Sequence, residues 1–331
     1  MIITVAMLDH WRRGFFGADD WARLESSGTV RVLPEPLVLD GATLAGTEVL
    51  ITGWDTPVLS EATVAGCPDL RAVIHAGGSV RRLVERGVYD RGVVVSSQAG
   101  LNAIPVAQFC LAEILLALKG ARPAERLYRA TRQLAAFGNP LGDLGWSVGA
   151  YGATVGLIGY GRICACLIEL LRPHGLRLLL ASPYPSAEQA REWDVELVSL
   201  AEAMRADVVS VHLGDTQDNW GAISGELLAL MPDGATLINT ARGIVVDQAA
   251  LVAELVTGRI NAILDVTWPE LPAPDSPLWT LPNVSLTPHW AGSLGRELTR
   301  LGRGVVVNVE EYLAGRPLTG AIDPDLADFI A

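Results

Sequence analysis

Arg242, Glu270 and His289 are the residues of this sequence whose types and order suggest acid–base chemistry, because each follows the carboxyl end of an apolar, strand-like run. An arginine can bind a carboxylate through two parallel hydrogen bonds. A histidine can exchange a proton near neutral pH, and a glutamate can pair with the imidazole and keep it oriented. The set is typical of a site that protonates or deprotonates a substrate carrying a carboxylate.

Each of these residues also has a purely structural interpretation. Arg242 could cap a helix or pair on the surface, Glu270 could be a solvated carboxylate in its proline-rich loop, and His289 could be a hydrogen-bonded residue of a turn. The carboxyl ends of parallel strands meet at one edge of a sheet, where ligands bind in open α/β folds. Three such residues on one predicted edge favour the catalytic interpretation.

A glycine-rich turn between Gly159 and Gly161 predicts binding of a dinucleotide. The apolar run Thr154–Gly159 leads into Gly-x-Gly, and the amphipathic segment Ile163–Leu171 follows it. The first glycine permits the tight turn, the second lets the backbone approach a pyrophosphate, and the N–H groups of the new helix face the negative charge. An ordinary strand–helix turn is the alternative, since the motif alone is weak.

Two positions depart from the usual nucleotide fingerprint. Cys164 stands where the third glycine normally lies, and a small side chain there is compatible with close packing of helix and strand. Ser182 ends the next strand, where a carboxylate would bind the adenosine ribose of NAD. Serine does not repel the 2′-phosphate of NADP, but no arginine or lysine follows immediately to bind it. The choice between NAD and NADP therefore stays open.

The elements that must position these residues form two series of alternating strands and helices. Buried runs of this kind predict parallel strands covered by helices on both faces, hence a doubly wound α/β fold. The segment 104–136 predicts one or two helices broken near Gly120–Pro123, and Ser293–Tyr312 a terminal helix. The predicted strands are Ile2–Leu8, Glu48–Trp54, Leu70–Ala76, Val93–Ser97, Thr154–Gly159, Leu176–Ser182, Asp207–Leu213, Ala235–Thr240, Asn261–Val266 and Val284–Pro288.

Composition narrows the classes of protein to which the chain can belong. Its 331 residues suggest two domains, half of the residues are hydrophobic, and the formal net charge is −12. An acidic surface disfavours nucleic acid and anionic membranes as partners, and no apolar run is expected to be long enough to span a bilayer. The four cysteines are scattered, and Cys164 and Cys166 lack further zinc ligands, so we expect no metal site and a reduced, cytoplasmic protein.

The motifs taken together resemble the D-isomer-specific 2-hydroxyacid dehydrogenase family, over about residues 70–302. The resemblance is carried by VGLIGYGRIC, by the long segment from VHLGDTQ to LVAEL, by ILDVTWPE and by LTPHWAGS. It implies that Arg242 binds the substrate carboxylate, that His289 protonates the keto oxygen as hydride arrives, and that Glu270 pairs with His289.

The resemblance also implies a division of the chain and a set of binding residues. A Rossmann dinucleotide-binding domain would span 104–291, and a flavodoxin-like substrate domain would combine 1–103 with 292–331, with the active site in the cleft between them and a homodimer built on the Rossmann domains. Residues 104–118 and the segment near Trp146 are candidates for the dimer contact. Gly78 and Ser79 would bind substrate with Arg242. The cofactor would contact Gly159, Gly161, Arg162, Ile163, Ser182, Leu213, Thr240, Ala241, Asp265 and Gly292.

The resulting hypothesis is an oxidoreductase that uses NAD or NADP with a small 2-keto or D-2-hydroxy acid, with substrates similar to glyoxylate or hydroxypyruvate favoured. Departures at Gly214, Asp215, Trp268 and Leu271 leave the side chain of the substrate open. Two alternatives remain: a dehydrogenase of another small anion, and an NAD(H)-sensing scaffold of the same fold with little turnover.

Overall fold

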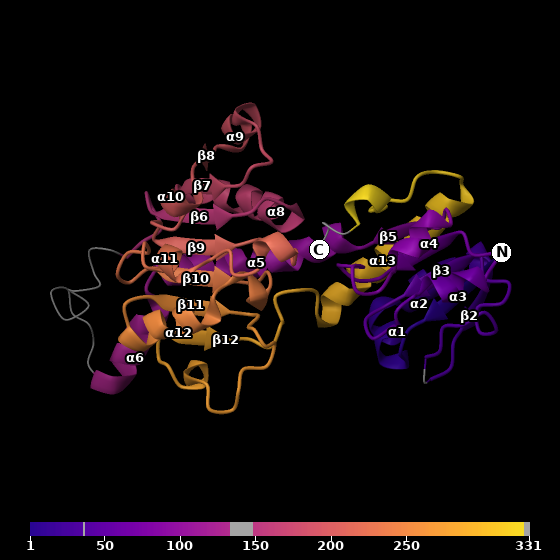
Figure 1. The fold of residues 1–331 in the computed structure, drawn as a ribbon, viewed down its shortest axis with the longest axis horizontal. Helices are drawn as coiled ribbons and strands as arrows, with labels where there is room; N and C mark the ends of the chain where they lie inside the picture. The colour runs from indigo at the N-terminus through magenta and orange to yellow at the C-terminus, as the bar shows by residue number, and fades with distance from the viewer. Residues whose placement is uncertain (36, 133–147, 328–331) are drawn as a thin grey trace. The chain divides into compact units, whose positions relative to one another are not determined.

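The computed structural model describes residues 1–35, 37–132 and 148–327, so the segment near Trp146 lies outside the described residues. The chain divides into two compact units, one formed by Met1–Ala103 with Gly292–Ala331 and the other by Ile104–Ala291. Each unit holds one sheet in which every strand pair is parallel (Figure 1). The prediction of two doubly wound parallel sheets is confirmed.

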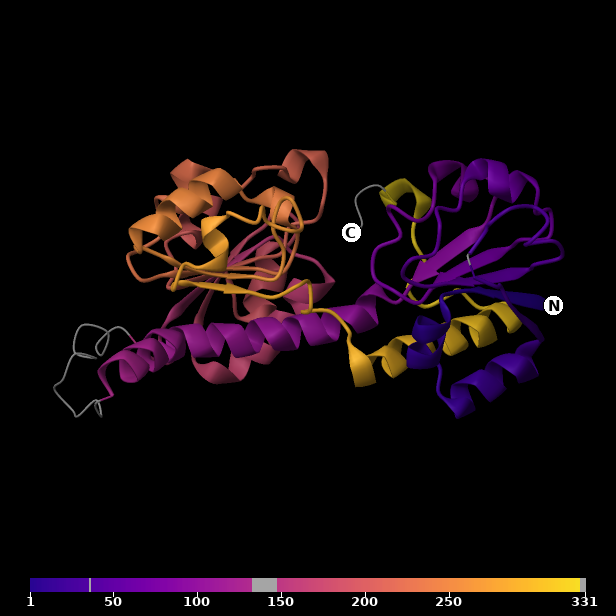
Figure 2. The same cartoon turned by 90° about the horizontal axis from the view of Figure 1, so that it is seen from below.

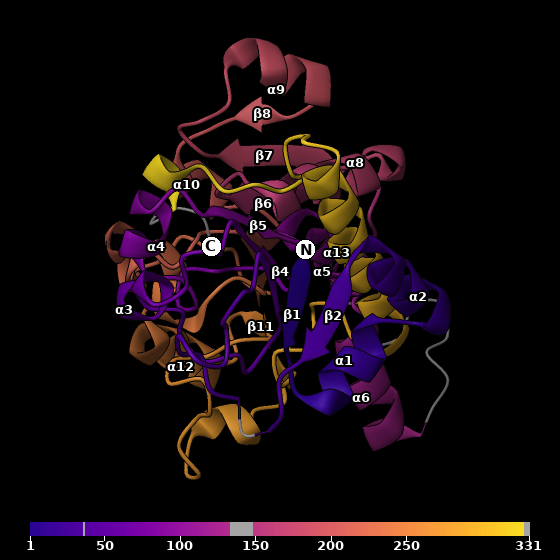
Figure 3. The ribbon, with the colours of Figure 1, turned by 90° about the vertical axis from the view of Figure 1, so that its right-hand side faces the viewer.

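The first unit contains a five-stranded sheet in the order β2-β1-β3-β4-β5, which is the flavodoxin-like order. Its C-terminal helix α13 packs on α1 and α2, on the face opposite α3 and α4 (Figure 3). The elements are β1 (Ile2–Ala6), α1 (Asp9–Phe15), α2 (Ala18–Ser27), β2 (Thr29–Val32), β3 (Val49–Thr52), α3 (Glu61–Ala65), β4 (Ala72–His75), α4 (Arg86–Asp90), β5 (Val94–Ser97) and α13 (Leu298–Leu313).

The inner strands β1, β3 and β4 of the first sheet are buried on both faces because alternate side chains enter two different cores. Ile51 and Ile74 pack in the core that also holds residues of α1 and α13, whereas Leu50 and Val73 pack in the core beneath α3 and α4. This is the arrangement that continuous apolar strands predict. The sequence missed β2, because Thr29–Val32 is short, contains an arginine and lies at the edge of the sheet.

The second unit contains a seven-stranded sheet in the order β12-β11-β10-β9-β6-β7-β8. The order reverses at β6 and β9, as in a Rossmann fold. Its elements are α6 (Ala121–Thr131), β6 (Thr154–Ile158), α8 (Arg162–Leu171), β7 (Arg177–Ala181), α9 (Ala187–Trp193), β8 (Glu196–Leu197), α10 (Leu200–Ala203), β9 (Val208–Val211), α11 (Gly225–Leu228), β10 (Thr236–Asn239), α12 (Gln248–Thr257), β11 (Asn261–Leu264) and β12 (Val284–Leu286).

Helix α5 (Ala99–Leu118) is longer than the sequence indicated, because it begins five residues before Ile104 and continues through Pro105. Figure 2 shows it along the face of the seven-stranded sheet that α8 also covers. By length and composition alone this one described helix could cross a membrane, with a mean hydropathy of 1.8, so the expectation that no run is long enough was wrong. Its apolar stripe of Val106, Cys110 and Ile114 is instead packed in the core of the unit.

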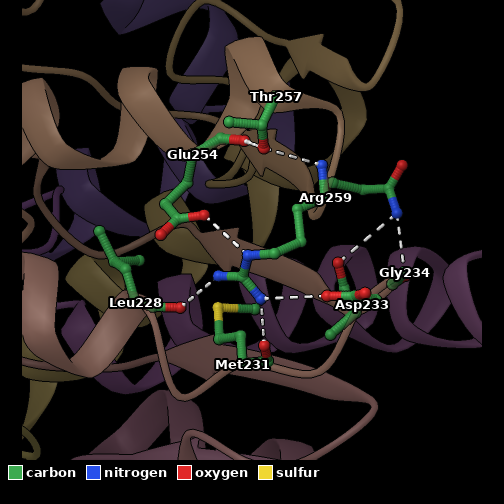
Figure 4. A network of polar contacts seen from close by, with 9 residues as sticks. Leu228, Met231, Asp233, Gly234, Glu254, Thr257 and Arg259 are labelled. Atoms are coloured by element: carbon green, nitrogen blue, oxygen red, sulfur yellow. Dashed lines mark hydrogen bonds and ion pairs between the residues drawn. The ribbon is translucent and has the colours of Figure 1, made fainter.

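Arg259 ties the end of α12 to the loop that leads into β10 (Figure 4). Its guanidinium donates to the carbonyl oxygens of Leu228, at 2.9 Å, and Met231, and its Nε donates to Glu254 Oε2 at 2.8 Å. Leu228 O, at the end of α11, also accepts from Met231 N at 3.2 Å, whereas Met231 O has no other donor among the described residues. The side chain of Arg259 thereby joins α12, the end of α11 and the loop that follows α11.

Candidate active site

The side chains of His289 and Glu270 are in direct contact at the carboxyl edge of the seven-stranded sheet. Glu270 lies in the loop after β11, and His289 follows β12, the neighbouring strand. Nδ1 of His289 lies 2.6 Å from Oε1 of Glu270, and the two side chains are 51% and 60% exposed. His289 has a φ of +59°, in the left-handed region that non-glycine residues rarely occupy. Backbone strain of this kind is characteristic of functional sites, where the surrounding structure holds a side chain in one orientation.

Asp265 holds the turn that carries His289. Its carboxylate is 2% exposed and accepts hydrogen bonds from Thr287 Oγ1 at 2.6 Å, Trp290 N at 2.7 Å and Ala291 N at 3.0 Å. Its backbone oxygen also accepts from His289 N at 2.9 Å. The sequence placed Asp265 at the cofactor, and that role stays a prediction. The contacts of its side chain show that it fixes the backbone on both sides of the histidine.

Arg242 is positioned by Asn239, a buried residue at the end of β10 that the sequence analysis did not single out. Asn239 donates from Nδ2 to Arg242 O at 2.9 Å and accepts from Ala241 N at 3.0 Å. The Cα of Gly243 lies against the backbone of Thr267, where any β-carbon would overlap it at 2.0 Å. The loops after β10 and β11 are therefore locked together. A buried asparagine at a strand end is the signal that could have identified this turn.

The turn at Gly159 has the geometry that a pyrophosphate requires. Gly159 has a φ of +90°, and a β-carbon there would lie 2.8 Å from His212 O. A β-carbon on Gly161 would instead point into open space. Arg162 and Ile163 begin α8, where N–H groups have no helical partner and no side chain caps them. The open backbone and the uncapped ten-residue helix fit a bound dinucleotide phosphate.

The other residues expected at the cofactor lie near this turn or behind it. A β-carbon at Gly159 would touch Leu213, at 3.1 Å, and Ser182 directly follows β7, the strand beside β6. The hydroxyl of Thr240 lies 3.2 Å from the Sγ of buried Cys110, so a contact between Thr240 and a cofactor would use its backbone. Cys164 is fully buried, and burial raises its pKa to about 12, so the neutral thiol fills the place of the third glycine as a small apolar group.

His212 lies directly after β9, and its side chain has no described hydrogen-bond partner at either ring nitrogen. Burial lowers the pKa of His212 to about 4, so the ring is neutral near pH 7. His75, at the end of β4 in the first unit, is also buried, and its pKa is likewise lowered to about 4. Its Nδ1 lies 3.0 Å from Thr52 Oγ1. Neither histidine was identified from the sequence.

Gly78, Ser79 and Gly292 belong to the first unit, and their roles in binding stay predictions. Gly78 and Ser79 follow β4 in an irregular turn. Within the described residues, the backbone N–H groups of Gly78 and Ser79 donate to no protein acceptor. Gly292 packs against Asn102, whose Oδ1 accepts from Ser293 N at 2.9 Å. The structure thus brings His289 and Glu270 into contact, with Asp265 supporting the turn of the histidine. It also places Leu213 beside the glycine turn at Gly159.

The chain matches the family model described as D-isomer specific 2-hydroxyacid dehydrogenase, NAD binding domain, over residues 114–291, which is more than half of the chain. It is 33% identical to a D-3-phosphoglycerate dehydrogenase of Mycobacterium tuberculosis over 78% of this chain. It covers 48% of that relative, so the chain spans about half the length of those phosphoglycerate dehydrogenases.

Other similarities extend over nearly the whole chain. A (S)-sulfolactate dehydrogenase of Chromohalobacter salexigens is 33% identical, with 90% of each chain covered. The TT0316 protein of Thermus thermophilus, a solved structure, matches with a TM-score of 0.76 and 26% identity over 98% of this chain and 100% of its own. Both units of the fold are therefore shared with known proteins, and the resemblance stated from the sequence motifs is confirmed.

Proposed function

Because the chain belongs to the D-isomer-specific 2-hydroxyacid dehydrogenase family, we propose that it transfers a hydride between NAD(P)H and a 2-keto acid, or in reverse from a D-2-hydroxy acid. The observation that carries the proposal is the contact of 2.6 Å between His289 and Glu270, held by Asp265 on the sheet edge that also bears the phosphate turn. We assign cofactor binding to the Ile104–Ala291 unit and substrate binding to the other unit.

The glycine turn and the start of α8 would hold the dinucleotide, whose nicotinamide would supply the hydride for C2 of the keto acid. His289 donates a proton from Nε2 to the developing alkoxide, because its Nδ1 is engaged with Glu270. The carboxylate of Glu270 stabilises the charged imidazole and fixes the orientation of the ring. Arg242 would bind the substrate carboxylate through its guanidinium. In the oxidative direction the neutral imidazole takes the proton from the hydroxyl.

The backbone of the turn after β4 would supply the remaining anion contacts. Gly78 and Ser79 present N–H groups that no protein acceptor occupies within the described chain, and consecutive N–H groups of this kind bind carboxylates. Arg162, Ile163, Ser182, Leu213, Ala241 and Gly292 remain assigned to the cofactor. The choice between NAD and NADP stays open, since Ser182 neither binds nor repels a 2′-phosphate by charge.

The partners and the location of the protein are part of the proposal, which its acidic charge and its free cysteines Cys67, Cys110, Cys164 and Cys166 support. With a net charge of −12, neither nucleic acid nor an anionic membrane is a favourable partner. We place the protein in the cytoplasm as a homodimer. The outer side of α5, where Leu116 is 44% exposed, is the dimer contact that we favour.

Turnover of a panel of keto acids tests the proposal. Purified protein should oxidise NADH or NADPH with at least one of glyoxylate, hydroxypyruvate or 2-ketobutyrate. His289→Ala should abolish this turnover and leave cofactor affinity, measured by quenching of tryptophan fluorescence, nearly unchanged, because the imidazole acts in the transition state. Tight cofactor binding with no turnover of any keto acid tested would contradict the proposal and favour an NAD(H)-sensing scaffold.

A further inference from the structure

Three aromatic side chains gather where β1, β3 and β4 end in the first unit. Trp54 follows β3, and its ring lies 4.9 Å from that of Trp11 in an edge-to-face arrangement and 5.3 Å from that of Phe15. Phe15 is fully buried, whereas the two indoles are only partly covered. In the order β2-β1-β3-β4-β5, β1 and β3 flank the point where the strand order reverses, which is where doubly wound sheets bind ligands.

The turn that carries Trp54 is held in one conformation. Gly53 N donates to Thr56 Oγ1 at 2.9 Å, and that hydroxyl donates to Ala6 O at the end of β1 at 2.7 Å. Asp55 has a φ of +64°, and its Oδ2 accepts from Trp11 Nε1 at 3.0 Å. A residue other than glycine is strained in the left-handed conformation, so this turn is maintained by its hydrogen bonds, which fix the position of the indole.

Trp54 borders the turn whose N–H groups are free. A β-carbon on Gly77 would lie 2.8 Å from Trp54 Nε1 and 2.4 Å from His75 Nε2, so the edge of the indole abuts the backbone here. Gly78 and Ser79 follow directly. If the carboxylate of a substrate binds to the N–H groups of Gly78 and Ser79, the substituent next to that carboxylate lies beside the indole of Trp54.

Two arginines next to these aromatics are already engaged with other side chains. Arg12 and Arg13, on α1, both pair with Asp9, at 2.5 Å and 2.7 Å. The guanidinium of Arg12 also lies 5.0 Å from the ring centre of Trp21. Arg81 and Arg82 follow the turn and are exposed. A phosphorylated or sulfonated substrate would have to use them.

The catalytic edge of the second unit independently carries large exposed aromatics. Trp290 directly follows His289 and is 59% exposed, because its backbone N–H is held by Asp265 while its ring stays outside the core. Trp268, two residues before Glu270, is 54% exposed. Tryptophan is costly to expose to water and is characteristic of sites where a ring or an apolar group docks.

We propose that the substrates are 2-keto and 2-hydroxy acids with an aromatic ring on C3, the arylpyruvate class, and that Trp54 is the residue that selects them. This proposal rests on the proposed function. The free N–H groups of Gly78 and Ser79 hold the carboxylate, and the aryl ring stacks on the indole of Trp54. An aromatic pair contributes about fivefold in affinity beyond the apolar area that it buries, and burial of the ring raises the expected selection to roughly tenfold or more.

The test compares kcat/KM for phenylpyruvate and indole-3-pyruvate with the values for glyoxylate, hydroxypyruvate and phosphohydroxypyruvate, with each cofactor. We expect the arylpyruvates to be favoured by about tenfold or more. Trp54→Ala should remove that preference and change kcat/KM for glyoxylate less than about threefold, whereas Trp54→Phe should retain most of it. Trp21→Ala, which removes an indole of the same unit, is the control and should leave the preference intact.

The outcomes separate this inference from the function on which it rests. Turnover of glyoxylate without a preference for arylpyruvates, or a preference that survives in a folded Trp54→Leu variant, overturns the inference and leaves the function standing. A preference for phosphohydroxypyruvate that Arg81→Ala abolishes also overturns it and shows an anionic substrate. Absence of turnover with every keto acid overturns both.

Discussion

Replacing Asp265 by asparagine removes one charge beneath the catalytic histidine without changing the volume of the side chain. The carboxylate accepts three hydrogen bonds, at 2.6, 2.7 and 3.0 Å, all from the turn that carries His289. An amide has one oxygen, which can keep Thr287 Oγ1 and Trp290 N, and its NH2 group must then face the N–H of Ala291.

The size of the effect follows from these contacts. One buried donor left without an acceptor costs about 1–3 kcal/mol. The two retained bonds lose the strengthening that a charged acceptor gives. We therefore expect Asp265→Asn to lower the free energy of unfolding by about 2–4 kcal/mol. The histidine turn should also shift, and a displacement of about 1 Å in a catalytic group costs on the order of 100-fold in rate.

The assay has two parts. Urea unfolding at pH 7 measures stability, and steady-state kinetics should show kcat reduced by about 10–100-fold with KM and cofactor affinity changed far less. Asp275→Asn is the matched control, because Asp275 is exposed in the same loop region and should have wild-type stability and rate. If Asp265→Asn had the stability and kcat of the wild type, Asp265 would not be what holds His289.

Two further predictions concern stability. Burial lowers the pKa of both His75 and His212 to about 4, from an ordinary value of 6.5. As the pH falls, the unfolded chain therefore takes up these protons before the folded chain does. The contribution of the two neutral histidines to the free energy of unfolding is complete above about pH 6.5. It is lost toward pH 4, by no more than about 1.4 kcal/mol per pH unit for each histidine. Urea unfolding between pH 5 and 8 should show this fall, and His212→Leu should weaken it; an unchanged slope would refute the assignment. Arg259→Met should cost about 1–3 kcal/mol in urea unfolding, because it leaves the carbonyl of Met231 without its described donor and removes the bonds to Leu228 O and Glu254. Arg177→Met, which removes an exposed pair with Glu196, should cost less than about 1 kcal/mol, and equal losses would contradict the role of Arg259.

The sequence predicted the central strands well, because each is an apolar run that both faces of a sheet must bury. All ten predicted strands contain an observed one, and each extends one or more residues too far at one or both ends, as in Leu70–Ala76 against Ala72–His75. The two missed strands, Thr29–Val32 and Glu196–Leu197, lie at sheet edges. These two carry charged side chains and have no continuous apolar run, so the pattern of residues does not reveal them, whereas the edge strands Val94–Ser97 and Val284–Leu286 lie in apolar runs and were predicted.

The pair of His289 and Glu270 was accessible from sequence because both residues follow strands that turned out to be neighbours. What supports that pair was not accessible. Asp265 supports the turn of His289, and Asn239 supports the turn of Arg242, each through side-chain hydrogen bonds to the backbone of a loop. Such bonds depend on the conformation of the loop rather than on the spacing of residues in the sequence. The neutral state of His212 likewise depends on complete burial, which no local pattern of residues indicates.

Asp265 and Trp54 show that the two units use similar means to fix a functional residue. In each unit, a residue that is not glycine adopts a left-handed conformation just after a strand: His289 with φ +59° and Asp55 with φ +64°. In each, a side-chain oxygen binds the backbone of the turn, from Asp265 in one case and from Thr56 in the other. Because strained turns persist only where their surroundings hold them, the orientation of His289 and of Trp54 is a property of the folded unit and exists before any ligand binds.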